Sequence, residues 1–248
     1  MGANGILGVG LSKQDCGRAC EPLARPNAAN GKYFVCKDAA CTSVTGTTLA
    51  SDQQLQQVVA RFATDNNGFA IQMDSVPQAG AAIAKGKMIF GLGTRANNQY
   101  PTLQVLATNS NGLFNGELSG SNDLAGLYFP STFLDTGSNG IYFDTYLPRC
   151  GLVNYIDFYC PPADVNFNVL LGNAAAARSA QRFTLGNAFA LFQSGNSALP
   201  TLGGILNAPG LLDLGLPFFY GKTVLIGIDG MPASGVGNRA ATGPFYAL

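Results

Sequence analysis

Histidine is missing from all 248 residues of the chain. Its absence excludes Ser-His-Asp and Cys-His catalysis, and with them the common zinc sites and any histidine proton shuttle. Glutamate is nearly as scarce, because it occurs only at Glu21 and Glu117. General acid-base chemistry in this protein would therefore fall to aspartate, tyrosine or lysine side chains.

Charge of either sign is sparse as well, since only 11% of the residues are charged. Lys and Arg number 14 and Asp and Glu number 14, which leaves no basic surface large enough to favour nucleic acid or an anionic membrane. No apolar run has the length of a transmembrane span. Because 47% of the residues are apolar, the chain can still bury a large core. We expect a globular protein with no nucleic-acid partner.

Turn-forming residues are abundant, with 32 glycines and 13 prolines beside many Asn and Ser residues. They separate short apolar or alternating runs, which is typical of β-strands joined by tight turns. This pattern predicts an all-β fold. The expected strands are residues 69–73, 87–90, 103–107, 132–134, 140–143, 165–171, 182–185 and 223–228.

One helix is expected, over residues 52–62. Leu55, Val58, Val59 and Phe62 follow the i, i+3, i+4, i+7 spacing of an amphipathic helix. Ser51 or Asp52 can cap its first turn.

The six cysteines lie in three close couples: Cys16 with Cys20, Cys36 with Cys41, and Cys150 with Cys160. An even number of cysteines in turn-rich sequence is typical of disulfides, which form in oxidising compartments. A zinc site is the alternative, but without histidine it would need four thiolates, and no couple has the C-x2-C spacing. We therefore expect local disulfides and a periplasmic or extracellular location.

The beginning of the sequence does not resemble an export signal. Residues 1–5 contain no positively charged region, and no long apolar stretch follows them. Because disulfides of this kind require export, we expect that further sequence, including the export signal, precedes Met1.

One acidic residue stands between two apolar, strand-like segments in residues 133–143. Asp135 is followed at once by Thr136, Gly137 and Ser138, so hydroxyls and backbone N–H groups lie close enough to orient its carboxylate. These residue types suit aspartic peptidase chemistry, in which two carboxylates share one proton and a water molecule. The alternative is that the four residues form only an Asx-type turn, which is plausible in Gly- and Ser-rich sequence.

The order of segments along the chain resembles the pepsin family of aspartic peptidases. Asp135, Thr136 and Gly137 are similar to the catalytic triplet of the second lobe. The other similar segments are residues 4–10, 52–62, 69–73 and 88–93 for the end of the first lobe, and residues 212–219 with 223–227 for the late Leu-Gly segment. The resemblance implies a pepsin-like fold, with an incomplete first lobe in residues 1–95 and a complete second lobe in residues 96–248.

A narrower resemblance is to an uncharacterised family of bacterial exported, pepsin-like proteins. The similar segments are residues 14–17, 62–68, 215–219 and 243–246. This resemblance implies a longer parent, whose N-terminal lobe would supply the first Asp-Thr-Gly and the flap over the cleft. Leu216 departs from the pattern, because peptidases often place Asp after the Leu-Gly pair.

Two functions are compatible with these features. In the first, Asp135 pairs with an aspartate of the N-terminal lobe and activates water to cleave a peptide or protein substrate, with Thr136, Gly137 and Ser138 completing the motif. This chemistry needs no cofactor and no metal, and the chain is expected to be inactive without the other lobe. In the second, the same fold serves a non-catalytic exported module that binds peptide or glycan, or a structural envelope protein.

An aromatic group follows the Asp135 motif, and it could either line a substrate cleft or pack in the core. Core packing is the more common use of aromatic side chains. The group consists of Tyr142, Phe143, Tyr146, Tyr155, Phe158 and Tyr159.

Overall fold

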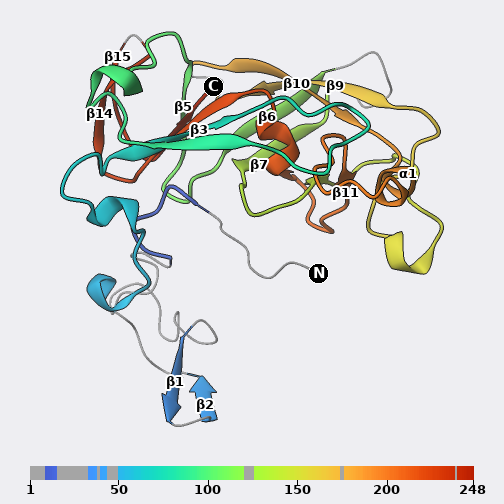
Figure 1. The fold of residues 1–248 in the computed structure, drawn as a ribbon, viewed down its shortest axis with the longest axis horizontal. Coiled ribbons are helices and arrows are strands. Elements are labelled where there is room, and N and C mark those ends of the chain that lie inside the picture. Colours follow the sequence, from blue (N-terminus) through green and yellow to red (C-terminus); the bar gives the residue numbers. More distant parts are fainter. Residues whose placement is uncertain are drawn as a thin grey trace.

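A computed structural model gives the structure of the protein and describes residues 9–15, 33–37, 40–43, 50–119, 126–173, 176–237 and 239–248. The described chain is mostly β-structure (Figure 1), which confirms the predicted all-β class. Its one α-helix within these ranges is α1 (Ala188–Gln193), and the short 3₁₀-helices are η2 (Ser51–Gln53), η3 (Val59–Arg61), η4 (Ala96–Asn98), η5 (Val153–Tyr155) and η6 (Leu216–Phe219).

Seven strands form the larger sheet, in the order β10-β9-β6-β7-β12-β8-β11. Most neighbours in it are antiparallel, but β12 runs parallel to β7 and β11 runs parallel to β8. The strands are β6 (Phe114–Ser119), β7 (Tyr128–Leu134), β8 (Ile141–Phe143), β9 (Val165–Leu171), β10 (Ser179–Leu185), β11 (Gly203–Gly204) and β12 (Leu211–Leu214).

A second sheet has five strands, in the order β4-β3-β13-β16-β5. Its central strand is β13, which is antiparallel to β3 with Ala70 opposite Leu225. The sheet therefore joins strands from both sides of residue 95, and the division of the chain into two lobes at that point stays a prediction. The strands are β3 (Gly68–Met73), β4 (Gly86–Phe90), β5 (Val105–Ala107), β13 (Thr223–Gly227) and β16 (Phe245–Ala247).

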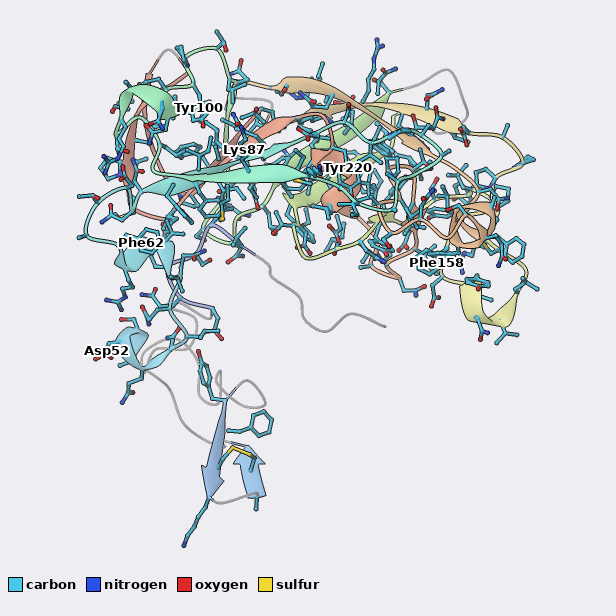
Figure 2. The ribbon with its side chains drawn as sticks, in the orientation of Figure 1. Asp52, Phe62, Lys87, Tyr100, Phe158 and Tyr220 are labelled. Atoms are coloured by element: carbon cyan, nitrogen blue, oxygen red, sulfur yellow. A yellow bond between two sulfur atoms is a disulfide. The ribbon has the colours of Figure 1, made fainter. Side chains whose placement is uncertain are left out.

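Two separate hairpins complete the described β-structure. β14 (Pro232–Val236) pairs with β15 (Arg239–Thr242), and β1 (Phe34–Lys37) pairs with β2 (Ala40–Ser43). The β1–β2 hairpin lies well away from the two larger sheets in Figure 1. A disulfide between Cys36 and Cys41 closes it, and the yellow bond in Figure 2 marks this link.

The predicted helix over residues 52–62 is wrong. Only η2 and η3 are helical there, and the backbone between them pairs with the chain near Lys13. The Gln57 N–H donates to the Lys13 carbonyl at 2.7 Å, and the Asp15 N–H donates to the Leu55 carbonyl at 3.2 Å. These bonds hold residues 55–57 extended, so Leu55 is 70% exposed.

The main core lies between the strands of the larger sheet and those of the five-stranded sheet. Phe143 is fully buried, and its ring contacts Phe129 and Phe167 edge-on, each at 5.7 Å between ring centroids. Tyr159 is also fully buried, whereas Tyr146 is 94% exposed. Some members of the aromatic group after Asp135 therefore pack in the core, which is the more common use of aromatic side chains, and others lie at the surface.

Candidate functional site

The Asp135 segment connects two strands that do not pair with each other. β7 ends at Leu134 and β8 begins at Ile141, while β12 lies between them and pairs with both. In this register Asp213 of β12 is opposite Phe133 on one side and Tyr142 on the other. The loop 135–140 therefore passes over the end of β12.

Backbone contacts tie the loop to that end. The Asp135 N–H donates to the Leu214 carbonyl at 3.0 Å, and the Leu216 N–H donates to the Ser138 carbonyl at 2.8 Å. Between them, Gly215 lies so close to the loop that a Cβ atom there would come within 2.0 Å of the Gly140 carbonyl oxygen. Only glycine permits this approach.

The loop holds the Asp135 carboxylate by its own hydrogen-bond donors. The Gly137 N–H donates to Asp135 Oδ1 at 2.7 Å, and Ser138 Oγ lies 2.8 Å from Asp135 Oδ2. Thr136 has a different partner, because its hydroxyl accepts the Val9 N–H at 3.0 Å. The structure thus brings three of the four motif residues into direct contact, and it joins the fourth to the N-terminal segment.

A second carboxyl group reaches the same serine. Ser138 Oγ lies 2.7 Å from Asp213 Oδ2, so one hydroxyl stands between the two aspartates. Asp213 is only 4% exposed, and among the described residues no group donates to its Oδ1. Burial raises the pKa of Asp213 to about 7, the Ser138 hydrogen bond opposes this rise, and the charge of Asp135 adds to it.

Tyr142 lies beside Asp213 on the neighbouring strand. Burial raises the pKa of Tyr142 to about 12, and the charge of Asp213 contributes to the rise. The Tyr142 hydroxyl donates to Asn139 Oδ1 at 2.5 Å. This bond fixes the middle of the 135–140 loop against β8.

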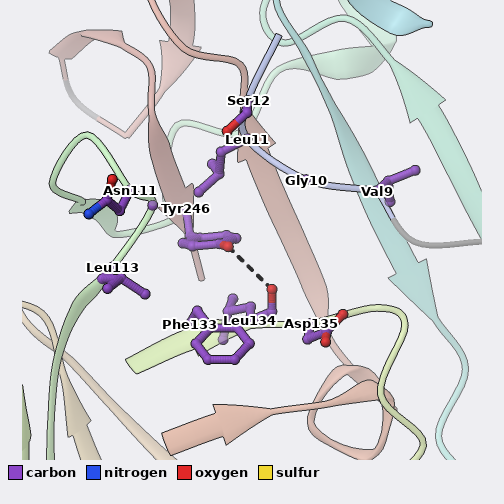
Figure 3. A pocket seen from close by; sticks show the side chains of 11 residues that line it. Val9, Gly10, Leu11, Ser12, Asn111, Leu113, Phe133, Leu134, Asp135 and Tyr246 are labelled. Atoms are coloured by element: carbon purple, nitrogen blue, oxygen red, sulfur yellow. Dashed lines mark hydrogen bonds between the residues drawn. The ribbon is translucent and has the colours of Figure 1, made fainter. Parts of the chain in front are cut away.

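A cavity of about 440 Å³ opens beside Asp135. Tyr246 lines it, and the Tyr246 hydroxyl donates to the Leu134 carbonyl at 3.2 Å (Figure 3). Asp135 is the one carboxylate among the described residues of its lining, and Asp213 does not reach it. The other lining residues are mainly apolar: Val9, Gly10, Leu11, Ser12, Asn111, Gly112, Leu113, Phe133 and Leu134.

Sequence reasoning did not identify Asp213. The local signal was present, because Asp213 is a single carboxylate within the apolar run Leu211 to Leu214, and aspartate is depleted in strands. A buried strand position makes such a residue noteworthy. Its relation to Asp135 follows from the β7–β12 pairing, which the sequence pattern did not specify.

The structure also tests the cysteine predictions. Cys36 is bonded to Cys41 and Cys150 to Cys160, as predicted, while Cys16 and Cys20 lie outside the described residues. These two disulfides indicate an oxidising environment, which is typical of exported proteins.

Two further features bear on possible ligands and location. In the described ranges, no three Cys, Asp or Glu side chains come together as metal ligands would. None of the helices in the same ranges is long and apolar enough to cross a membrane.

Comparison with known proteins places the chain in a family but adds no activity. No curated protein matches the sequence. The model of one protein family, described as a protein of unknown function (DUF3443), matches residues 1–248. The chain therefore belongs to the DUF3443 family.

Proposed function

We propose that this chain is the part of an exported, pepsin-like aspartic endopeptidase that activates water at Asp135. The observation that supports this most is the setting of Asp135. Asp135 lines an otherwise mainly apolar cavity of about 440 Å³, and its carboxylate is hydrogen-bonded to the Gly137 N–H and the Ser138 hydroxyl. A fixed carboxylate at the wall of a cleft is the arrangement that a general base requires.

In the proposed reaction, Asp135 takes a proton from a water molecule, and the water oxygen adds to the peptide carbonyl carbon. The carbonyl oxygen takes a proton from a second carboxyl group. When the C–N bond then breaks, the leaving nitrogen takes the proton that Asp135 holds, and a hydroxyl proton of the tetrahedral intermediate returns to the second carboxylate as the new carboxylic acid forms. No cofactor is needed for these steps.

The carboxyl group that faces Asp135 across the substrate is expected to come from an N-terminal lobe, as the resemblance to pepsin implies. Asp213 cannot take this position, because it is buried behind Ser138 and does not line the cavity. The two aspartates therefore have different roles in the proposal.

The apolar walls of the cavity support a peptide substrate. Leu11, Leu113 and Phe133 can accept an apolar side chain next to the bond that is cleaved, and burial of that side chain would contribute about 1.5–3 kcal/mol to binding. Exclusion of water would also strengthen the interaction between Asp135 and the reacting atoms. A periplasmic or extracellular location is part of the same proposal, since it suits the disulfides.

The test is the Asp135→Asn variant of the full-length exported protein, incubated with a denatured protein at acidic pH. Asparagine keeps the shape of the side chain but cannot take the proton from water, so we expect cleavage to fall by roughly 10³-fold or more. The cleavage products are quantified by mass spectrometry. Asp157→Asn is the matched control, because the Asp157 side chain is exposed and does not line the cavity.

Unchanged cleavage in Asp135→Asn would remove Asp135 from the mechanism. If the wild-type protein binds peptide or glycan without cleaving it, the non-catalytic exported module takes the place of the peptidase. Isothermal titration calorimetry with the uncleaved ligand distinguishes this outcome from an inactive preparation.

A further inference from the structure

The contacts of Ser138 fix the number of protons that the two aspartates hold. Ser138 Oγ lies 2.8 Å from Asp135 Oδ2 and 2.7 Å from Asp213 Oδ2, and both distances are those of hydrogen bonds. A serine hydroxyl has a single proton, so it can donate to only one of these oxygens. The other contact needs a proton on a carboxyl group. The three side chains therefore share two protons when both bonds are made.

The surroundings of the two aspartates decide where the second proton lies. Asp135 lines an open cavity and also accepts the Gly137 N–H at 2.7 Å, and both features favour a charged carboxylate. Asp213 is 4% exposed, and none of the described residues donates to its Oδ1. A charge there would be buried without compensation. The proton is therefore held by Asp213.

The ionisable groups around Asp213 also favour its protonated form. Asp135 contributes a negative charge across Ser138. Tyr142 on β8 and Tyr246 on β16 are the other ionisable neighbours, and burial holds the pKa of each well above its usual range. Neither salt bridge among the described residues involves Asp213. Nothing described near Asp213 would favour its charged form, apart from the Ser138 hydroxyl.

We propose that Asp213 is a proton-holding positioning residue, which donates to Ser138 so that the Ser138 hydroxyl must donate to Asp135. The chain of donors, Asp213 to Ser138 to Asp135, keeps Asp135 in the charged form that accepts a proton from water. This effect on catalysis rests on the proposed peptidase function, whereas the protonation of Asp213 does not. The buried pair would gain a second negative charge as Asp213 loses its proton, and the burial of Asp213 raises its pKa to about 7.

The direct test measures the proton and not the reaction. Infrared difference spectroscopy of the 248-residue chain across a pH titration detects the carbonyl band of protonated carboxyl groups, and the Asp213→Asn variant identifies the band that belongs to Asp213. We expect that band to persist to a midpoint near pH 7. In Asp135→Asn we expect the midpoint to shift to lower pH, because the neighbouring charge that favours the neutral form is removed. A midpoint near pH 4, the ordinary value for aspartate, would overturn the proposal.

A second measurement uses the full-length protein and compares cleavage rates above and below the Asp213 midpoint. For the wild type, we expect loss of the Asp213 proton to lower the cleavage rate by about tenfold for each pH unit above 7. The asparagine of Asp213→Asn can donate an N–H to Ser138 at every pH, so this part of the decline should disappear. Asp157→Asn, matched in chemistry but exposed, should keep it.

The two measurements separate the two proposals. If the protein cleaves nothing but the Asp213 band titrates near pH 7, the peptidase function fails and the protonation of Asp213 stands. If the protein cleaves peptides and Asp213 titrates near pH 4, the reverse holds. Circular dichroism of each variant establishes that it is folded, and if Asp213→Asn does not fold, the Asp213 band is identified as the one whose midpoint moves in Asp135→Asn, because the Asp135 charge acts on Asp213.

Discussion

Ser138 lies between the carboxyl groups of Asp135 and Asp213, and the fold alone brings Asp213 to it, since Asp213 follows Ser138 by 75 residues in the chain. We expect Ser138→Ala to lower the free energy of unfolding by about 1–3 kcal/mol at acidic pH, because it leaves the buried Asp213 Oδ2 without its partner. Urea unfolding followed by fluorescence or circular dichroism measures the change.

Ser75→Ala is the control for this variant. Ser75 is exposed and makes no side-chain hydrogen bond among those described, so its hydroxyl can be removed at little cost. Equal stability of the two alanine variants would mean that the Ser138 hydroxyl does not bridge the aspartates in solution.

The two aspartates differ in how far the sequence could predict them. Asp135 is recognisable because its partners Gly137 and Ser138 are sequence neighbours, so a short motif contains most of its environment. The environment of Asp213 consists of residues from β7, β8 and the loop between them. A residue whose chemistry depends on strand pairing cannot be identified from its flanking residues alone.

Gly215 sets how closely the end of β12 approaches the 135–140 loop. We expect Gly215→Ala to destabilise the protein by about 3 kcal/mol, because the new methyl group would lie within 2.0 Å of the Gly140 carbonyl oxygen and 2.8 Å of the Ser138 carbonyl oxygen. The loop must move away to admit it. Thermal unfolding monitored by circular dichroism measures the loss.

Gly151→Ala is the matched control, since a Cβ atom there has no neighbour within 4 Å. If Gly215→Ala is as stable as Gly151→Ala, Gly215 does not lie as close to the 135–140 loop as the structure shows. A loss of stability confined to Gly215→Ala would support the geometry on which the Ser138 bridge depends.

The elements that the sequence predicted best are strands whose burial alternates. β9 is an example, because Phe167, Val169 and Leu171 are buried while Asn166 and Asn168 between them are exposed. The helix expected over residues 52–62, in contrast, did not form. Its apolar spacing was correct, but backbone pairing with the Lys13 segment overrode the local preference.

The short helix α1 was not predicted. Its six residues span less than two turns, too few for a periodic pattern to emerge. Its clearest sequence signal is Asn187, whose side chain accepts the Ala190 N–H at 3.1 Å and caps the first turn.

At the scale of the whole molecule, the buried carboxyl of Asp213 links stability to pH. Its pKa rises from 3.8 to about 7 on folding, so the folded chain binds this proton more tightly than the unfolded chain does. The resulting stabilisation is complete below pH 3.8 and is lost as the pH rises through 7. Three pKa units correspond to about 4 kcal/mol at most.

Other groups with shifted pKa values affect stability mainly outside the pH range in which Asp213 does. Hydrogen bonds from Arg95 and Thr94 lower the pKa of Asp65 below 3.8, so the stabilisation from Asp65 is lost only at more acidic pH. Burial lowers the pKa of Lys222 to about 8, and the stabilisation from Lys222 is therefore lost as the pH falls from 10.5 through 8. Among the described residues, Asp213 is the shifted group that titrates between about pH 4 and 7.

We therefore expect the wild-type chain to be more stable at about pH 5 than at about pH 7.5, by an amount on the order of 2 kcal/mol within the 4 kcal/mol limit. Urea unfolding at the two pH values measures it. Asp213→Asn should lose this difference, because an amide does not titrate, whereas Asp157→Asn should retain it. A wild-type protein that is equally stable at both pH values, or an Asp213→Asn variant that keeps the difference, would show that the buried carboxyl is not protonated in the folded chain. The pH dependence of stability thus tests, without any substrate, whether Asp213 is protonated in the folded chain.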